Sequence, residues 1–191
     1  PPRYLNLFEI IPHTATDLEV IQFFEHYADL FLGKTPVLAK DTPAFIANRI
    51  GVFSMSAIFQ LMNDFNLSIG EIDTITGPLT GKPKSATFRT ADVVGLDTLI
   101  KVAKGVYDNC PEDERRSTFQ IPDFVLTMEK NRWLGDKTGQ GFYKKSKNDQ
   151  GKRVFLELDP KTLEYKETPK RSFDSAAQAK AAGGLQNKLR V

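Results

Sequence analysis

The sequence predicts a mainly α-helical domain, with one short strand near its beginning and a small β-hairpin near its end. Its 191 residues are 40% hydrophobic and 26% charged, which is typical of a globular protein. Apolar residues recur every three or four positions over most of residues 16–133, as they do in amphipathic helices. Beyond Gly135 the pattern changes to glycine turns and short alternating segments. The length fits one domain, or one domain and part of another.

The first 40 residues predict a strand, a helix and a connector. Residues 5–11 are apolar and are stopped by Pro12, which favours a buried strand whose sheet partners we expect outside this chain. From Thr16 apolar side chains recur at helical spacing up to a stop at Gly33, so an amphipathic helix is expected there. Residues 35–40 are expected to form a brief extended connector.

The longest helix is expected to end near Asn63. Asp41 offers a capping side chain, and Pro43 fits a first turn, where its missing N–H costs nothing. Apolar side chains cover most of the helix circumference, so we expect this helix to be central and buried on several sides. Ser68 and Glu71 have the spacing of a capping box, which predicts a short helix ended by residues 77–78.

The second half predicts two more helices and the hairpin. One helix is expected over residues 90–109, after a loop at residues 79–88, and another from Pro122 to Gly135. Two alternating segments, residues 154–158 and 163–165, flank a turn that contains Pro160 and are therefore expected to pair. An alanine-rich helix is expected over residues 175–182, ended by residues 183–184.

The charges argue against several classes of partner. Lys and Arg number 26 against 24 Asp and Glu, and no nucleic-acid reading motif is present, so we expect no nucleic-acid partner. Residues 1–129 hold 11 basic and 17 acidic side chains, whereas residues 130–191 hold 15 and 7. The basic end is interpreted as a solvated tail, with a phosphate-bearing ligand or an acidic neighbour as the alternative.

Neither a membrane span nor a metal site is expected. The longest apolar stretch, residues 44–62, is interrupted by polar side chains, so we predict no membrane span. Two histidines and the single Cys110 are too scattered for a tetrahedral zinc site. One cysteine also favours a reducing compartment, and the chain begins at Pro1 without an initiator Met, so we expect a cytoplasmic piece of a longer polypeptide.

Two polar residues interrupt apolar segments and are candidate functional residues. Glu9 lies within the predicted strand, where a buried carboxylate needs a charged or hydrogen-bonding partner, although on an edge strand it would simply face water. Asn48 poses a similar alternative in the long helix: it satisfies backbone groups at a domain contact, or its amide points at a ligand carbonyl. The residues alone leave both alternatives open.

Six segments occur in an order that is specific when they are taken together. They are residues 1–11 (PPRYLNLFEII), 33–37 (GKTPV), 40–49 (KDTPAFIANR), 71–73 (EID), 92–97 (DVVGLD) and 135–143 (GDKTGQGFY). This set resembles the 3-hydroxyacyl-CoA dehydrogenase family. Residues 85–91 depart from the family pattern, and residues 144–191 extend beyond the end of its short members. That extension is similar to the one in long multifunctional β-oxidation enzymes.

The resemblance implies a domain division. In that family an N-terminal Rossmann domain binds NAD, and a helical C-terminal domain forms a homodimer and encloses the acyl-CoA. This chain resembles the second part, with a fold of the 6-phosphogluconate-dehydrogenase-like type. Residues 1–14 would end the NAD-binding domain or a linker, residues 15–143 would form the helical domain, and residues 144–191 would form a basic extension with the hairpin and a possible linker helix.

The resemblance also implies site residues and a reaction. The family's catalytic histidine would lie just before Pro1, Glu9 would be its carboxylate partner, and Asn48 would position the substrate. Arg49 would support helix packing. The implied reaction is NAD-dependent oxidation of (S)-3-hydroxyacyl-CoA to 3-oxoacyl-CoA in fatty-acid β-oxidation, in which the imidazole takes the 3-hydroxyl proton while hydride leaves C3.

No cofactor-binding residue is expected in this chain, because it has no G-x-G-x-x-G segment. The isolated chain is therefore expected to be inactive. The alternative function is a non-catalytic, all-helical dimerisation module, in which the apolar central helix packs against a second copy.

Overall fold

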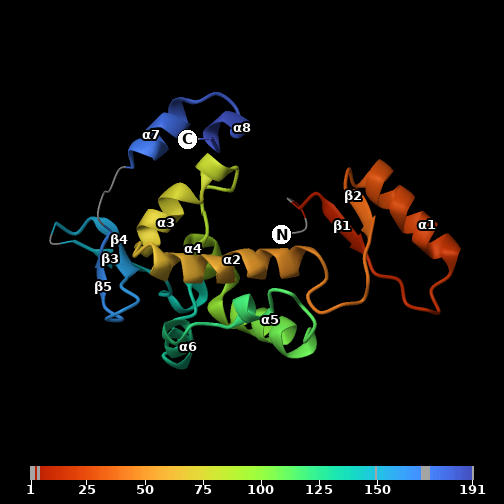
Figure 1. Ribbon diagram of the computed structural model, residues 1–191, viewed down its shortest axis with the longest axis horizontal. Helices are drawn as coiled ribbons and strands as arrows, with labels where there is room; N and C mark the ends of the chain where they lie inside the picture. Colours follow the sequence, from red (N-terminus) through yellow and green to blue (C-terminus); the bar gives the residue numbers. More distant parts are fainter. Residues whose placement is uncertain (1–2, 4, 149, 169–172, 191) are drawn as a thin grey trace.

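A computed structural model describes residue 3 and residues 5–148, 150–168 and 173–190. A small βαβ unit lies at one end of the long axis, helix α2 runs through the middle, and a three-stranded sheet lies at the other end (Figure 1). The α-helices are α1 (Leu18–His26), α2 (Ala47–Asp64), α3 (Ile69–Ile75), α4 (Phe88–Val94), α5 (Leu96–Asn109), α6 (Asp123–Lys130), α7 (Asp174–Ala181) and α8 (Leu185–Lys188). The strands are β1 (Leu7–Ile10), β2 (Thr35–Leu38), β3 (Tyr143–Lys147), β4 (Arg153–Leu158) and β5 (Tyr165–Glu167).

The predicted fold class is confirmed: the chain is mainly helical, with a short N-terminal strand and a C-terminal hairpin. The prediction that β1 pairs only with strands outside the chain is wrong. Strand β2 pairs with it in parallel and places Glu9 opposite Val37. Residues 11–34 supply the long crossover that parallel strands require, so the segment that we expected to be a connector forms a strand.

Helix α1 carries an apolar face that the described chain leaves largely uncovered. It continues as a π-helical turn (Tyr27–Phe31), and Gly33 ends the segment with a φ of 59°, as predicted. Only Ala28 is fully buried, whereas Leu18 is 66% exposed and Phe31 is 76% exposed. The predicted helix is present, but its apolar face has no complete cover within the described residues.

Helix α2 begins at Ala47, several residues later than the sequence predicts. No side chain of the expected Asp41–Pro43 start caps it, because Ala44 and Phe45 have φ values of 66° and 48°. Two left-handed residues cannot belong to a right-handed helix, so the helix can only start after them.

Helix α2 is buried on one side only, which corrects the expectation of burial on several sides. Phe59 and Met62 are each 2% exposed, whereas Ile50 is 64% exposed and Leu61 is 48% exposed. The apolar residues on the second face meet no cover among the described residues.

The helix expected over residues 90–109 is two helices. Gly95, with a φ of 99°, separates α4 from α5, and the Leu96 N–H bonds to the carbonyl oxygen of Leu134 at 3.2 Å. The helix that begins after Pro122 likewise ends at Lys130, before Gly135. The capping box of Ser68 and Glu71 is present as predicted at the start of α3.

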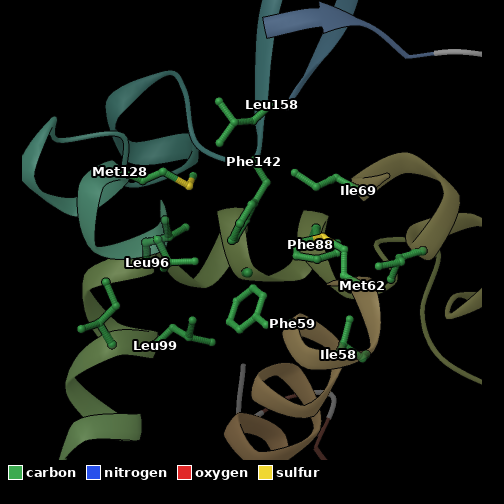
Figure 2. Packing of buried hydrophobic residues seen from close by; sticks show 14 residues of the cluster. Ile58, Phe59, Met62, Ile69, Phe88, Leu96, Leu99, Met128, Phe142 and Leu158 are labelled. Atoms are coloured by element: carbon green, nitrogen blue, oxygen red, sulfur yellow. The ribbon is translucent and has the colours of Figure 1, made fainter. Parts of the chain in front are cut away.

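The main core gathers side chains from the helices and from the C-terminal sheet. Phe59, Phe88 and Phe142 point toward one another at its centre, with ring centroids 4.8–6.0 Å apart (Figure 2). Each large side chain that is fully buried contributes about 1.5–3 kcal/mol before entropy is considered. The buried members are Ile58, Phe59, Met62, Ile69, Ile72, Phe88, Ala91, Leu96, Leu99, Ile100, Val125, Met128, Phe142 and Leu158.

The C-terminal extension packs on the helical part. Strands β4 and β5 form the predicted hairpin, and β3 adds a third antiparallel strand. Leu158 of β4 is 1% exposed in the main core, and Glu157 accepts a hydrogen bond from the Gly70 N–H at 2.9 Å. Strand β4 is therefore not part of a solvated tail. Helix α7 confirms the predicted alanine-rich helix.

Candidate active site

The carboxylate of Glu9 binds the start of helix α2. The Ile46 N–H donates to its Oε2 at 2.8 Å, and the Ala47 N–H donates to its Oε1 at 3.1 Å. Glu9 is half-buried in β1, and helix α2 has no cap from a side chain of its own N-cap residue. The negative charge lies where the helix dipole is positive, so Glu9 acts as the cap of α2 from 37 residues upstream.

The backbone before α2 aims these two N–H groups. Ala44 and Phe45 are both left-handed, a conformation that costs about 1–2 kcal/mol for a residue other than glycine. The Phe45 N–H closes the turn on the carbonyl oxygen of Thr42 at 3.0 Å. Strained residues of this kind persist only where the surrounding structure holds them.

The Glu9 carboxylate retains capacity for another donor. An ionised carboxylate offers about four lone-pair positions, and the two backbone N–H groups use one on each oxygen. No other hydrogen bond from a described residue reaches these oxygens. An imidazole N–H brought to this site could therefore be accepted without displacing either contact.

Asn48 stands next to this site on the first turn of α2. Its side chain is exposed and makes no hydrogen bond to any residue in the described ranges. Arg49, the next residue, instead forms an ion pair with Asp113, which holds the pKa of that carboxyl below its usual range. The structure thus brings Glu9 and Asn48 to one helix end, and Arg49 ties that end to the loop after α5.

A second carboxylate, Asp73, caps helix α4 in a comparable way. Its Oδ1 accepts the N–H groups of Thr87 and Phe88 at 3.0 and 2.7 Å, and its Oδ2 accepts the Arg89 N–H at 3.0 Å. The Tyr143 hydroxyl also donates to Oδ2, at 2.9 Å. Burial nevertheless raises the pKa of Asp73. Four donors fill its acceptor positions, so Asp73 has a structural role.

A third carboxylate, Asp92, is fully buried and holds the 135–143 segment against α4. It accepts the N–H groups of Phe142 and Tyr143 at 2.8 and 2.9 Å. Burial raises its pKa to about 6, against a usual value of 3.8. A Cβ at Gly141 would overlap with the Asp92 carboxylate, so the glycine is required by close packing. The glycines of this segment form a turn that fits a structural role.

A cavity of about 400 Å³ lies away from Glu9, between the α2–α3 connection and the β4–β5 turn. Two buried carboxylates line it, and each accepts a backbone N–H: Glu71 from Ser68 and Glu157 from Gly70. Both therefore serve as caps at the start of α3.

Within the ranges that the structure describes, no three His, Cys, Asp or Glu side chains come close enough to hold a metal ion. No described helix combines the length and the apolar character needed to cross a bilayer.

The sequence named Glu9 and Asn48 as candidate residues but did not predict that backbone N–H groups at the start of α2 bind Glu9. The N–H groups that bind Glu9 carry no side-chain signature, and the left-handed conformations of Ala44 and Phe45 are not indicated by residue type. Asp73 and Asp92 were contained in segments quoted for the family resemblance, but their capping roles depend on partners 14 and 50 residues away.

Comparisons with known proteins identify the family. Residues 45–145 match the family described as 3-hydroxyacyl-CoA dehydrogenase, C-terminal domain. A Bacillus subtilis relative, "Probable 3-hydroxyacyl-CoA dehydrogenase", is 48% identical over 191 residues, which are all of this chain and 23% of that protein. A Rickettsia prowazekii protein described as a fatty acid oxidation complex trifunctional enzyme is 30% identical over 193 residues, covering 99% of this chain and 26% of its own length.

Solved structures agree with this result. The crystal structure of FadB2 of M. tuberculosis superposes with a TM-score of 0.63 at 25% identity, over 75% of this chain and 49% of that chain. The 3-hydroxybutyryl-CoA dehydrogenase of Escherichia coli K12 has the same fold, with a TM-score of 0.60 at 24% identity over 74% of this chain and 29% of that chain. The chain spans only about a quarter of the Bacillus and Rickettsia proteins. Because the family match includes more than half of its residues, the chain belongs to the 3-hydroxyacyl-CoA dehydrogenase family and contains its C-terminal domain.

Proposed function

We propose that this chain is the substrate-enclosing and dimer-forming part of an NAD-dependent (S)-3-hydroxyacyl-CoA dehydrogenase of fatty-acid β-oxidation. The observation that carries the proposal is the Glu9 carboxylate, which is half-buried, held by two backbone N–H groups and still able to accept another donor. A carboxylate held in this way is suited to orient a histidine base and to stabilise the imidazolium that forms.

In the proposed reaction the substrate loses one proton and one hydride. The 3-hydroxyl proton moves to the imidazole, C3 becomes a carbonyl carbon, and NAD, when bound, supplies the acceptor for the hydride. Glu9 accepts the other ring N–H and so fixes the tautomer that can take the proton. Its negative charge stabilises the imidazolium, which favours proton transfer.

Asn48 is proposed to position the acyl-CoA. Its amide is exposed, has no hydrogen-bond partner among the described residues, and lies one residue after the Ala47 N–H that binds Glu9. An amide N–H donated to a substrate carbonyl would place the acyl chain beside the base.

The NAD site and the histidine are proposed to belong to a preceding Rossmann domain of the same parent protein. A two-stranded parallel sheet is not stable alone, since parallel sheets are normally covered on both faces. The exposed aromatic side chains of Phe23, Tyr27 and Phe31 stack along the segment from α1 into the π-helical turn, at centroid distances of 5.7 and 5.5 Å. The βαβ unit therefore fits as the last part of a larger sheet.

The chain is further proposed to form a homodimer through its helical part. Ile50, Leu61 and Phe65 are 64, 48 and 68% exposed, an apolar surface that suits an interface between copies. A multifunctional parent and a cytoplasmic location also remain predictions.

Turnover of the full-length protein tests the proposal. With (S)-3-hydroxyacyl-CoA and NAD it should produce NADH, and Glu9→Gln should lower kcat about a hundredfold or more, as with other carboxylates that orient a catalytic histidine. Glu112→Gln, which changes an exposed carboxylate on a loop, serves as the control and should leave kcat unchanged. The isolated chain should produce none. Absence of NADH formation by the full-length protein would refute the proposed function, and normal kcat in Glu9→Gln would remove Glu9 from it.

A further inference from the structure

The turn before α2 contains two adjacent left-handed residues, and neither is glycine. Six residues other than glycine have positive φ in the part of the chain that the structure describes. The other four stand singly, whereas Ala44 and Phe45 are consecutive. A double departure from the usual backbone conformation requires a local cause, and residues of this kind cluster at functional sites.

The two residues direct the chain so that the next two N–H groups point at a single side chain. The Ile46 N–H reaches one oxygen of Glu9 and the Ala47 N–H reaches the other, at 2.8 and 3.1 Å. One donor would fix only the position of the carboxylate. Two donors on different oxygens also fix its plane, and therefore the direction of the lone pairs that remain.

The same turn is tied to the residues that follow it. The carbonyl oxygen of Ala44 accepts the Arg49 N–H at 3.2 Å, across the first turn of α2. Asn48 lies within that turn, so its backbone position relative to the Glu9 carboxylate depends on the conformation of Ala44 and Phe45.

We propose that Ala44 and Phe45 are positioning residues for the dehydrogenase reaction. Their left-handed conformation orients Glu9 toward the histidine base and fixes Asn48 relative to it. This inference rests on the proposed function, because it assigns to the turn a role in that same site. Neither residue touches the reacting atoms; both act through the backbone.

Three substitutions in the full-length protein separate positioning from folding. Ala44→Val puts a β-branched residue where left-handed backbone is required, so it should disturb the turn, whereas Ala44→Gly adopts the same φ freely. Arg132→Val is the matched control, because Arg132 has a φ of 60°, is exposed, and lies in the loop after α6.

Ala44→Val should lower kcat about tenfold or more while KM for the acyl-CoA changes little, since preorganisation is lost. Ala44→Gly should have the same kcat as the wild type. Arg132→Val should lose a similar amount of thermal stability and keep its kcat. The acidic limb of the pH dependence of kcat/KM reports the pKa of the histidine base. In Ala44→Val this limb should move to lower pH, because a misoriented Glu9 stabilises the imidazolium less.

A second variant covers the case in which Ala44→Val does not fold. Replacing Ala47 with the corresponding α-hydroxy acid turns its amide into an ester, which deletes the N–H that binds Oε1 and keeps the side chain. A several-fold fall in kcat in the folded ester variant would support the inference.

Unchanged kcat in the ester variant or in Ala44→Val, or an equal loss of kcat in Arg132→Val, would overturn the positioning role. In those cases the wild-type protein would still produce NADH, so the failure differs from failure of the proposed function, in which the wild type itself is inactive.

Discussion

Helices α2 and α4 begin in the same way. In each, the residue before the N-cap residue is left-handed, Phe45 in one and Ala86 in the other. In each, a carboxylate from another element binds the first N–H groups, Glu9 for α2 and Asp73 for α4. The two carboxylates differ in how much hydrogen-bond acceptor capacity is left once the helix N–H groups are bound. Asp73 receives four donors, including the Tyr143 hydroxyl, whereas Glu9 receives two.

The difference separates a structural carboxylate from a candidate functional one. A carboxylate that accepts four hydrogen bonds, as Asp73 does, can stabilise the fold but can bind nothing further. A carboxylate with unused lone pairs, as Glu9 has, caps its helix in the same way and can also orient an incoming donor. Hydrogen-bond capacity that is left over after folding is therefore the property that distinguishes Glu9 from Asp73.

The largest effect on stability is expected for Asp73→Ala. This change leaves three backbone N–H groups and the Tyr143 hydroxyl without their acceptor. The free energy of unfolding should fall by about 3 kcal/mol or more, since each buried unsatisfied group costs about 1–3 kcal/mol. Urea denaturation followed by circular dichroism measures it. A loss below about 1 kcal/mol would show that water replaces the carboxylate without difficulty.

Asp92 should make the free energy of unfolding depend on pH. The sign of this dependence should be opposite to that caused by a salt-bridged carboxylate. Its pKa of about 6 in the folded state exceeds the usual 3.8, so the folded state binds more protons between these values. The contribution of Asp92 to stability therefore falls as pH rises from about 4 to about 6, by about 1–3 kcal/mol.

Asp92→Asn isolates this contribution, because the other carboxylates titrate in both proteins. As pH rises from about 4 to about 6, the free energy of unfolding of the wild type should fall relative to that of the variant. A constant difference would mean that the pKa of Asp92 is not raised.

Asn48→Ala should lower kcat/KM about tenfold in the full-length protein, the equivalent of one hydrogen bond to substrate. The thermal unfolding midpoint should not change, because the Asn48 amide has no partner among the described residues. A variant that loses stability but keeps kcat/KM would make Asn48 a packing residue.

The smallest effect is expected for Ala44→Gly. Glycine adopts a φ of 66° without the cost that alanine has there, although it also gains freedom in the unfolded chain. We expect a net stabilisation of up to about 1 kcal/mol. Destabilisation in a denaturation experiment would show that the alanine methyl group packs favourably enough to outweigh its backbone strain.

The sequence predicted the elements that depend on local patterns. Ser68 and Glu71 are three residues apart, so their capping box can be recognised without a structure. The alanine-rich helix α7 and the β4–β5 hairpin followed from composition and from the turn around Pro160. Glu9 could be found because a carboxylate in an apolar strand requires an explanation.

The features that the sequence missed depend on distant residues. Asp41 matched the local preference for an N-cap, but Glu9, from a strand 37 residues earlier, provides the cap of α2. The break at Gly95 was missed because the apolar spacing of α4 and α5 looks continuous. Strand β2 was missed because its partner β1 lies on the far side of the crossover formed by residues 11–34, and no local pattern indicates that pairing.

The most direct test compares Glu9→Gln with Asp73→Asn in the full-length protein, measuring kcat and the free energy of unfolding for both. Each variant exchanges a helix-capping carboxylate for an amide of the same size, whose NH₂ group cannot accept a backbone N–H. We predict that Asp73→Asn loses more stability yet keeps kcat within about threefold, whereas Glu9→Gln loses less stability and about a hundredfold or more in kcat. If both variants lose kcat in proportion to their loss of stability, Glu9 is a helix cap alone and does not orient the histidine.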